Sequence, residues 1–304
     1  MKPRVAIVIL CYNGVEDTLA CLRSLQALDY PAGAFELVVV DNASADGTSE
    51  AVRRTFPQVA VIETSANLGY AAGNNVGLRH ALAGGHAYAL LLNNDTEVAP
   101  DFLSHLVEVA ESDCSVGAAG PTIYYAERPD LIWSAGGVVD WRRGMSRMRG
   151  IGERDQGQYA EVSEVDFATG CALLMRRTAL EQVGLLDERF FMYYEETEWC
   201  ARLPRVGMRT VHVPQARLWH KIPVADRVDK PYVAYYMTRN RLLFLRATGS
   251  SLTAWAHAVI AQDLRTCLSL TLRRKWRGRL PQRNAMLRAW RDFLTGRFGI
   301  AGGL

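Results

Sequence analysis

Residues 5–11 read VAIVILC, a continuous apolar run that stops at Tyr12-Asn13-Gly14. A strand without a polar face is buried on both sides, which is typical of strands inside parallel sheets. Leucines with helical spacing follow over residues 15–28, so an amphipathic helix is predicted directly after this strand. A buried strand that leads into such a helix indicates a parallel sheet covered by helices.

The same alternation continues along the first half of the chain. Further apolar strands are predicted at 35–40, 59–62 and 88–92, and further helices at 47–56, 73–83 and 100–111. The second half loses this rhythm: we expect loops or short antiparallel strands at 132–148, strands at 166–175 and 209–213, a short helix at 178–183, and basic helices from Tyr235 onward. The pattern predicts an α/β fold of Rossmann-like type, with a mostly parallel sheet between helices.

The composition is that of an ordinary folded protein. Of 304 residues, 49% are apolar and 22% are charged, which excludes disordered, collagen-like and simple coiled-coil chains. The charge is unevenly distributed. Residues 1–238 hold 22 Lys and Arg against 30 Asp and Glu, whereas residues 239–304 hold 13 against 2. A slightly acidic body therefore carries a strongly basic tail.

The cysteines and the apolar runs bear on the cellular compartment. Six cysteines lie mostly in apolar runs and form no Cys-x-x-Cys pair, so they indicate reduced core thiols rather than disulfides or a zinc site. The longest candidate for a membrane span, Leu252–Leu272, is interrupted by His257, Asp263 and Arg265, and a span needs roughly 18 apolar residues. We therefore expect a cytoplasmic protein without a membrane-spanning helix.

Small and polar residues gather after the predicted strands of the first half. These segments are Cys11-Tyr12-Asn13-Gly14, Asp41-Asn42-Ala43-Ser44, Asn67-Leu68-Gly69 and Asn93-Asn94-Asp95. Each segment alone is consistent with turn chemistry. Because open α/β sheets bind ligands beyond the carboxyl ends of their strands, four such loops favour a binding site. The phosphate-binding patterns G-x-G-x-x-G after the first strand and G-x-x-x-x-G-K-[ST] do not occur, which disfavours dehydrogenases and P-loop enzymes.

Two further groups could carry chemistry. The cluster Glu195-Glu196-Thr197-Glu198 follows an aromatic-rich run at 190–194. It is either a solvated helix face or a place where a carboxylate lies beside rings, and such a carboxylate can act as a general base. His220 either binds a metal or fills a polar gap in the core.

Taken together, these segments resemble the inverting nucleotide-sugar glycosyltransferases of glycosyltransferase family 2, which have the GT-A fold, and in particular their bacterial rhamnosyltransferase-like group. The resemblance covers nearly the whole chain in the expected order. Its segments are residues 5–13, 40–48, 67–77, 91–96, 169–174, 190–202, 213–214 with His220, and 236–241. It implies a catalytic domain at 1–238, with a nucleotide-binding half at 1–120 and an acceptor-side half at 121–238, and a basic helical C-terminal extension at 239–304.

The resemblance also implies where a nucleoside-diphosphate sugar donor binds. Asp41 would bind the nucleobase. The other donor-binding residues would be Tyr12 and Asn13 beside the base, Asn67, Gly69 and Asn75 along the pocket, and Asn93 and Asn94 after the fourth strand.

The metal and the base are implied in the same way. Asn93-Asn94-Asp95 occupies the D-x-D position, where Asp95 would bind Mg²⁺ or Mn²⁺ that bridges the donor diphosphate. His220 would complete the metal site. Glu196, directly after Glu195, occupies the position of the catalytic base.

This sequence departs from the family pattern at three positions. Asn93 stands where the first aspartate of D-x-D is expected, and Glu196 stands where the base is usually aspartate. Asn74 replaces an arginine of many relatives, so we expect Arg239 or Arg241 to meet the charge of the diphosphate.

The expected activity is transfer, with inversion, of a sugar such as the deoxyhexose rhamnose to a hydroxyl of a glycan or lipid-linked acceptor. Two alternatives stay open: a nucleotidyltransferase, and a non-catalytic sugar-nucleotide-binding module. Because an acidic body adjoins the basic tail, we expect no nucleic-acid partner. Self-association stays open.

The basic tail carries an apolar stripe. Within 282–294, the stripe residues are Met286, Leu287, Trp290, Phe293 and Leu294, and a cationic run at 273–279 precedes them. Trp and Arg beside such a stripe suit an anionic membrane surface. The alternative is that the stripe packs on the catalytic domain or on a second subunit. The membrane hypothesis predicts a cytoplasmic protein that is peripheral at the inner membrane face.

Overall fold

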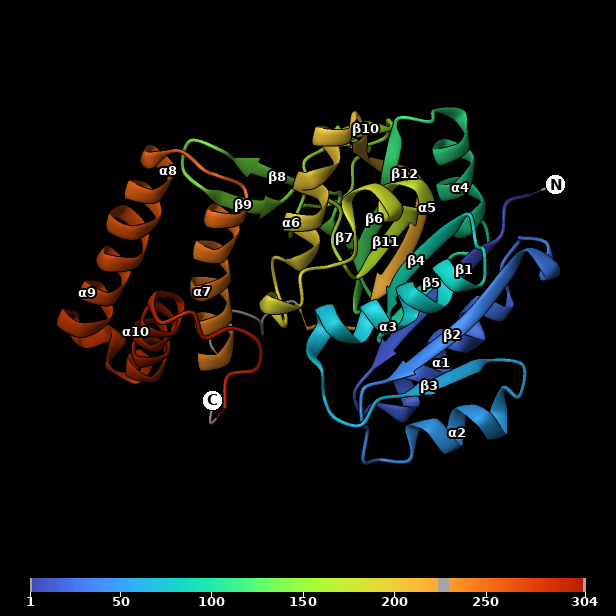
Figure 1. Ribbon diagram of the computed structural model, residues 1–304, viewed down its shortest axis with the longest axis horizontal. Coiled ribbons are helices and arrows are strands. Elements are labelled where there is room, and N and C mark those ends of the chain that lie inside the picture. Colours follow the sequence, from blue (N-terminus) through green and yellow to red (C-terminus); the bar gives the residue numbers. More distant parts are fainter. Residues whose placement is uncertain (1, 224–229, 303–304) are drawn as a thin grey trace.

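The computed structural model describes residues 2–223 and 230–302, and Figure 1 shows a sheet covered by helices with a separate group of helices beside it. The strands of the large sheet follow the order β10-β12-β6-β11-β4-β1-β2-β3, with β5 and β7 paired to β12 and β6. A hairpin of β8 and β9 forms a second, two-stranded sheet.

The strands are β1 (Val5–Cys11), β2 (Phe35–Asp41), β3 (Ala60–Glu63), β4 (Tyr88–Asn93), β5 (Thr96–Val98), β6 (Val116–Tyr125), β7 (Arg128–Ser134), β8 (Gly137–Asp140), β9 (Met145–Met148), β10 (Ser163–Val165), β11 (Ala172–Arg176) and β12 (Arg209–His220). The helices are α1 (Val15–Gln26), α2 (Thr48–Thr55), α3 (Gly69–Ala83), α4 (Phe102–Ser112), α5 (Arg177–Val183), α6 (Glu195–Arg202), α7 (Pro231–Ala247), α8 (Leu252–Ala256), α9 (Arg265–Leu272) and α10 (Leu280–Leu294). A π-helical segment, His257–Leu264, joins α8 to α9.

The alternating half of the sequence forms the parallel part of the sheet. Strand β1 pairs in parallel with β2 on one side and with β4 on the other, and β2 pairs in parallel with β3. The antiparallel strand β11 separates this block from β6 and β12. The expected α/β fold with a mostly parallel sheet and a helical C-terminal region is therefore confirmed.

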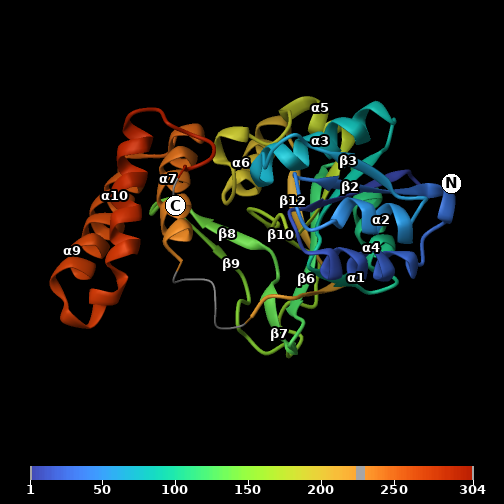
Figure 2. The same ribbon diagram turned by 90° about the horizontal axis from the view of Figure 1, so that it is seen from below.

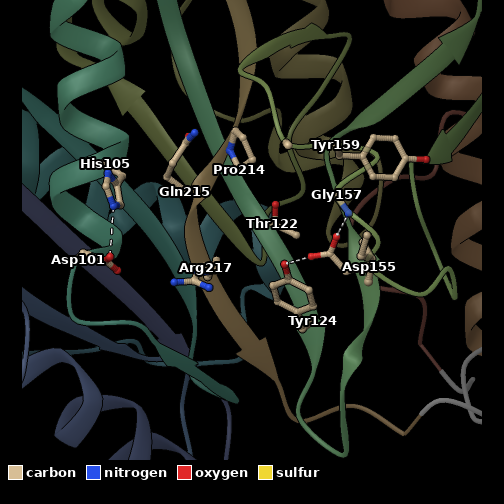
Figure 3. A pocket seen from close by; sticks show the side chains of 12 residues that line it. Asp101, His105, Thr122, Tyr124, Asp155, Gly157, Tyr159, Pro214, Gln215 and Arg217 are labelled. Atoms are coloured by element: carbon tan, nitrogen blue, oxygen red, sulfur yellow. Dashed lines mark hydrogen bonds and ion pairs between the residues drawn. The ribbon is translucent and has the colours of Figure 1, made fainter.

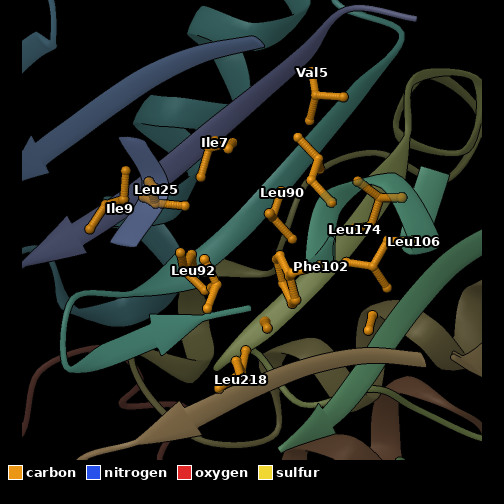
Figure 4. Close-up of a cluster of buried hydrophobic side chains, with 14 of the residues drawn as sticks. Val5, Ile7, Ile9, Leu25, Leu90, Leu92, Phe102, Leu106, Leu174 and Leu218 are labelled. Atoms are coloured by element: carbon orange, nitrogen blue, oxygen red, sulfur yellow. The ribbon is translucent and has the colours of Figure 1, made fainter. Parts of the chain in front are cut away.

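Two hydrophobic cores fill the two faces of the sheet. On one face, Ile7 and Ile9 of β1 pack with Leu25 of α1 and Phe102 of α4 (Figure 4). The other core joins Val8 of the same strand to residues of α3, α5, α6 and α7. Figure 2 separates the layers: α1 and α4 lie on one side of the sheet, and α3, α5 and α6 lie on the other. Because successive side chains of β1 point to opposite faces, its uniformly apolar sequence supplies both cores.

Helix α3 lies very close to β1 because it carries small residues on the contacting side. A Cβ atom at Gly77 would lie 2.2 Å from Val8 Cγ1, and one at Gly73 would lie 2.6 Å from Leu10 Cδ1. The glycines therefore let the helix approach the strand to a distance that a larger residue would prevent. This close contact fixes the start of α3 beside the carboxyl ends of β1 and β2.

One strand and one helix cross the domain boundaries that the sequence analysis predicts. The sequence analysis missed β6, although all ten of its residues are buried, because Gly, Ala and Pro in residues 117–121 obscured the strand pattern. Strand β6 runs across the expected boundary at 120/121, and α7 runs across the one at 238/239. The division into 1–238 and 239–304 stays a prediction, and α7 leads into the helical extension.

The extension packs differently from the predicted amphipathic stripe. Helix α10 lies against α7 and α9, with Met286 and Phe293 buried and Trp290 half-buried. Leu287 and Leu294 are exposed. Most of the stripe is thus used inside the extension, which favours the packing alternative for α10. Within residues 2–223 and 230–302, no helix is long and apolar enough to cross a membrane.

Candidate active site

The loops after β1 and β2 are tied together at the carboxyl edge of the sheet. Asn13 has a left-handed backbone conformation (φ 61°), and its N–H donates to Ser44 Oγ at 2.8 Å. Its Oδ1 accepts from the N–H of Ala45 at 2.9 Å. The neighbouring Tyr12 is 54% exposed. The edge therefore combines a fixed backbone with an exposed aromatic ring, as a platform for a planar ligand requires.

Asp41 ends β2 directly beside Cys11, the last residue of β1. Its Oδ1 accepts from the N–H of Ser44 at 2.8 Å, and its Oδ2 accepts from the hydroxyl of Ser49. The side chain is buried, so these bonds fix the orientation of the carboxylate.

The start of α3 is held to the same edge by amide side chains. Asn42 donates to Asn67 Oδ1 at 3.0 Å and accepts from the N–H of Leu68 at 2.9 Å. Asn67 Oδ1 also accepts from the N–H of Gly69 at 2.9 Å. Asn42, which the sequence analysis did not single out, thus links Asn67 and Gly69 to the end of β2, and their place along a donor pocket stays a prediction.

Asp95, two residues after the end of β4, contacts His220, which is distant in sequence. Asp95 Oδ1 lies 3.0 Å from Nε2 of His220, the last residue of β12. The antiparallel pairing of β5 with β12 brings these two residues together across 125 positions of sequence. The imidazole is fully buried and packs edge-on against Trp133, with ring centroids 4.7 Å apart. The structure therefore places side by side the two residues predicted to bind a metal.

The donor atoms of Asp95 and His220 fit a divalent cation. Adjacent ligands of an octahedral ion with bonds of about 2.1 Å lie about 3 Å apart, which matches the spacing of Asp95 Oδ1 and His220 Nε2. Carboxylate oxygen is a preferred ligand of Mg²⁺ and Mn²⁺, and neutral imidazole nitrogen is a common ligand of divalent metal ions in proteins. The described part of the chain holds no cluster of three or more His, Cys, Asp or Glu side chains suited to a metal. The other coordination positions would fall to substrate and water.

Asn93 and Asn94 make different contacts at this edge. Asn94 Nδ2 donates to the hydroxyl of Thr18 in α1 at 3.0 Å. The N–H of Asn93 donates to the carbonyl of Cys171 at 2.9 Å, and Asn93 lines a cavity.

That cavity has a volume of about 470 Å³ and lies between the sheet, the β8–β9 hairpin, α6 and α7. Its walls combine polar groups with many apolar and aromatic side chains. They are Tyr70, Asn93, Trp133, Ser146, Arg147, Met148, Ile151, Phe167, Thr169, Gly170, Cys171, Met192, Tyr193, Tyr194, Glu195, Glu196, Thr197, Val233 and Met237. The predicted base thus faces the same cavity as Asn93, the last residue of β4.

The two glutamates start α6, directly after a strained segment. Phe191, Tyr193 and Tyr194 all have positive φ angles, of 67°, 68° and 76°. Such conformations are uncommon for large side chains, and surrounding contacts must maintain them. The segment turns the chain sharply, so Glu195 and Glu196 enter the helix at the wall of the cavity.

Burial dominates the chemistry of this glutamate pair. Desolvation by burial, followed by the charge of Glu196, raises the pKa of Glu195 well above its ordinary value. Burial also raises the pKa of Glu196, while backbone N–H groups and a hydrogen bond with Glu195 act in the opposite direction. Two carboxyls this close do not readily ionise together, and the backbone N–H groups at Glu196 and Gly170 favour the charged form of Glu196.

Helix α7 holds the strained segment in place. Asn240 Nδ2 lies 2.8, 2.7 and 2.9 Å from the carbonyl oxygens of Phe190, Met192 and Tyr193. The side chain is fully buried. Sequence reasoning singled out no role for Asn240, although a buried amide on an apolar helix face was a signal that could have found it.

Arg239 and Arg241 do not reach the cavity, and their expected role at the diphosphate is corrected. Arg239 is 1% exposed and donates to the carbonyls of Gly299, at 2.7 Å, and Phe190, at 3.0 Å. Arg241 is buried and paired with Asp263. Both guanidinium groups therefore hold the extension together. Arg147 of β9 instead brings a cation to the cavity wall.

Asn75 also has a different place from the expected one. Its amide donates to the carbonyl of Leu186 at 2.9 Å and to Glu188 Oε1 at 3.0 Å, and it accepts from the N–H of Leu186 at 3.1 Å. The buried side chain is therefore occupied in joining α3 to the segment before α6. It does not line the cavity between α6 and α7.

A second cavity, of about 360 Å³, lies near α4, β6 and β12 (Figure 3). In it, Tyr124 donates to Asp155 Oδ2 at 2.5 Å, and His105 Nε2 lies 3.2 Å from Asp101 Oδ2. None of the predicted site residues lines this cavity. It is separate from the edge that carries Asp95 and the glutamate pair.

Comparisons with known proteins agree with this geometry. Residues 6–184 match the model of glycosyl transferase family 2. The chain is 29% identical over 251 residues to the low-salt glycan biosynthesis hexosyltransferase Agl10 of Haloferax volcanii. The aligned region covers 80% of this chain and 76% of that protein. It is also 29% identical over 261 residues to the N-acetylglucosaminyl-diphospho-decaprenol L-rhamnosyltransferase of Mycobacterium tuberculosis, with 77% of this chain and 81% of that protein covered.

A solved structure supports the fold. The mannosyltransferase PcManGT of Pyrobaculum calidifontis, determined with GDP-Man and Mn²⁺, matches 98% of this chain and 88% of its own, with a TM-score of 0.56 and 20% identity. The sheet topology and its helical layers are therefore those of the GT-A fold. With more than half of its length matched by the family model, the chain belongs to glycosyl transferase family 2.

Proposed function

We propose that this protein is an inverting glycosyltransferase that moves a hexose or deoxyhexose such as rhamnose from a nucleoside-diphosphate donor to a hydroxyl of a lipid-linked glycan. The observation that carries the proposal is the pair of buried Glu195 and half-buried Glu196, which shares one cavity with Asn93 at the end of β4. Asn93 lies two residues before Asp95, the partner of His220. The proposal therefore takes the loop after Asn93 as the link between the cavity that holds the glutamates and the Asp95–His220 pair, which does not itself line that cavity.

Glu196 acts as the general base in this proposal. As the acceptor oxygen forms a bond to the anomeric carbon, its proton passes to the Glu196 carboxylate, and the bond from carbon to the diphosphate oxygen breaks with its electron pair. Attack from the side opposite the leaving group inverts the anomeric configuration. Glu195 keeps its own proton because ionising a second carboxyl beside Glu196 is unfavourable. General-base catalysis of this kind contributes about 10²–10⁴-fold.

Asp95 and His220 would hold Mg²⁺ or Mn²⁺ at the donor diphosphate. A bound divalent cation supplies charge stabilisation for the departing diphosphate. Tyr12, Asn13 and Asp41 bind the nucleoside at the edge of the sheet, and Arg147 adds positive charge at the cavity wall.

The identity of the substrates is inferred from the relatives and from the cavity. One relative is named as an L-rhamnosyltransferase acting on N-acetylglucosaminyl-diphospho-decaprenol, and another as a hexosyltransferase of glycan biosynthesis. The cavity wall contains Met148, Ile151, Met192, Val233 and Met237. Such an apolar lining suits an acceptor whose sugar is attached to a lipid.

The test is a transfer assay with dTDP-rhamnose and a short-chain N-acetylglucosaminyl-diphospholipid, with and without Mn²⁺. Glu196→Gln should lower kcat by about 10²–10⁴-fold while leaving nucleotide affinity within a few-fold. Glu198→Gln is the matched control, because Glu198 lies on the same helix but pairs with Arg202 away from the cavity. NMR of the product's anomeric proton reads out the stereochemistry.

Three results would overturn the proposal. Retention at the anomeric carbon would exclude single displacement. Release of pyrophosphate from a nucleoside triphosphate and a sugar phosphate would identify a nucleotidyltransferase. Nucleotide-sugar binding without transfer or donor hydrolysis, for a panel of donors and acceptors, would identify a binding module.

A further inference from the structure

The helical extension ends in an outer rod with an uncovered apolar face. Helix α8, the π-helical segment and α9 run continuously from 252 to 272, and α9 is the outermost helix in both ribbon views (Figures 1 and 2). Ile260, Leu264, Leu268 and Leu272 are 60%, 52%, 49% and 75% exposed. We refer to these four residues as the outer ridge.

The four-residue spacing of the outer ridge places its members along one side of the rod. The opposite side carries Ala254, Ala258 and Leu270, which are buried. A surface helix usually has an apolar side against the protein and a polar side toward water. This rod differs, because large apolar side chains also lie on its exposed side. A continuous exposed stripe of this kind marks an interaction surface.

The charges around the outer ridge are of one sign. Residues 239–304 contain two acidic side chains, and both are buried and paired. Asp263 is bonded to Arg241 and to Trp290, and Asp292 is bonded to Tyr235. No exposed carboxylate side chain of the extension is therefore available to balance its exposed cations.

Those cations lie next to the outer ridge. Arg265 is exposed within α9, and Arg273, Arg274 and Lys275 are exposed directly after Leu272, the last member of the ridge. Trp276 is half-buried, with Lys275 Nζ 5.1 Å and the Arg279 guanidinium 4.6 Å from the ring centroids. Apolar, aromatic and cationic side chains are thus brought together at one end of the rod.

We propose that the outer ridge and these cations form a surface that docks on an anionic lipid bilayer, with the rod lying in the headgroup layer. Leucine and isoleucine enter the acyl boundary, Trp276 lies at the interface, and the arginines contact lipid phosphates. A second copy of the chain is the less suitable occupant, since two such surfaces would bring clusters of arginine and lysine together without counter-charges. The docking surface is therefore on the α8–α9 rod and not on the α10 stripe.

Binding of the extension to a membrane is independent of the proposed function, but the benefit of that binding for catalysis rests on it. Val233 and Met237 of α7 line the active-site cavity, and α7 also packs against α10 within the extension. Docking of the extension would therefore hold the cavity near the membrane that carries a lipid-linked acceptor.

Sedimentation with vesicles tests the surface directly. Vesicles of phosphatidylcholine with an equal amount of phosphatidylglycerol should bind the full chain at least 10-fold more tightly than pure phosphatidylcholine, and 0.5 M salt should weaken that binding. Leu264→Glu combined with Leu268→Glu should reduce binding to the anionic vesicles more than 10-fold. Leu294→Glu is the matched control, because Leu294 is an exposed leucine of α10 outside the outer ridge.

The controls separate this surface from the enzyme activity. Transfer to a short-chain, water-soluble acceptor should be unchanged in the Leu264→Glu/Leu268→Glu protein. If vesicle binding follows the expected pattern while no transfer is detected, the docking surface stands and the proposed function fails. Equal binding by wild type and the double variant overturns the docking proposal. A wild-type dimer that becomes monomeric in the double variant also overturns it and identifies an interface between copies.

Discussion

Asn240→Asp tests whether α7 positions the catalytic glutamates. The substitution preserves the shape of the side chain but replaces the Nδ2 donor by a carboxylate oxygen that faces the carbonyls of Phe190, Met192 and Tyr193 at 2.7–2.9 Å. The carbonyl of Phe190 keeps other donors, from Arg239 and from the N–H of Met192. Two carbonyls, those of Met192 and Tyr193, therefore lose the side-chain donor that holds them.

The expected loss follows from these two bonds. These two hydrogen bonds are partly buried and each contributes about 0.5–1.5 kcal/mol, so losing both lowers the unfolding free energy by about 1–3 kcal/mol. For a chain of this size, this corresponds to a fall in Tm of about 2–5 °C. The released segment contains three residues with positive φ, and relaxation of this strain would move Glu195 and Glu196. A displacement of about 1 Å can lower the rate about 10²-fold.

The assay combines thermal unfolding, nucleotide affinity and the transfer rate. We expect a lower Tm, a kcat lower by about 10²-fold, and nucleotide affinity within a few-fold of wild type, because the donor edge lies on β1, β2 and β4. Asn284→Asp in α10 is the control, since Asn284 is exposed. The positioning role is refuted if Asn240→Asp keeps full kcat, or if kcat and nucleotide affinity fall by the same factor.

Four further predictions concern the metal, the glutamate pair and the close packing at α3. Asp95→Ala should remove the Mn²⁺-dependent part of nucleoside-diphosphate affinity in calorimetry; equal affinities with metal and with chelator in the wild type would contradict the metal role. Because burial raises the pKa of Glu196 above its ordinary 4.5, kcat should fall on the acid side with a midpoint above pH 4.5, and a profile flat to pH 4 would exclude Glu196 as the base. Burial raises the pKa of Glu195 in the folded protein, so its contribution to folding stability is fully present below the pKa of the unfolded chain and is lost as the pH rises through the pKa of the folded protein. Glu195→Gln should therefore raise Tm at neutral pH, and this gain in Tm should disappear below pH 4.5. Gly69→Ala should lower Tm and kcat together, because a Cβ would lie 2.3 Å from the ring of Phe191 and φ is +80°; unchanged values would show that the ring can move aside at little cost.

The sequence pattern predicts which residues follow the strands of the sheet, but not which buried partners a polar side chain will contact. The positions of Asp41 and Asp95 follow from the strands that precede them, because a parallel sheet gathers the carboxyl ends of its strands at one edge. Arg239 and Arg241 were placed wrongly at the diphosphate, since a local motif does not tell whether a cation faces a cavity or a buried carbonyl. The same limitation applies to Asn75, which lies on the expected helix but bonds to Leu186.

The sequence alone determined the alternation of strands and helices, and with it the parallel block from β3 to β4. Both faces of β1 are apolar, and this property needs no knowledge of distant residues. The tertiary structure decided which distant groups meet. The pairing of β5 with β12 brings His220 to Asp95, and the bonds from Asn240 hold the strained turn that presents Glu195 and Glu196. Periodicity encodes which face of a segment is buried, whereas contacts across more than a hundred residues depend on strand register and helix docking, which only the folded chain fixes.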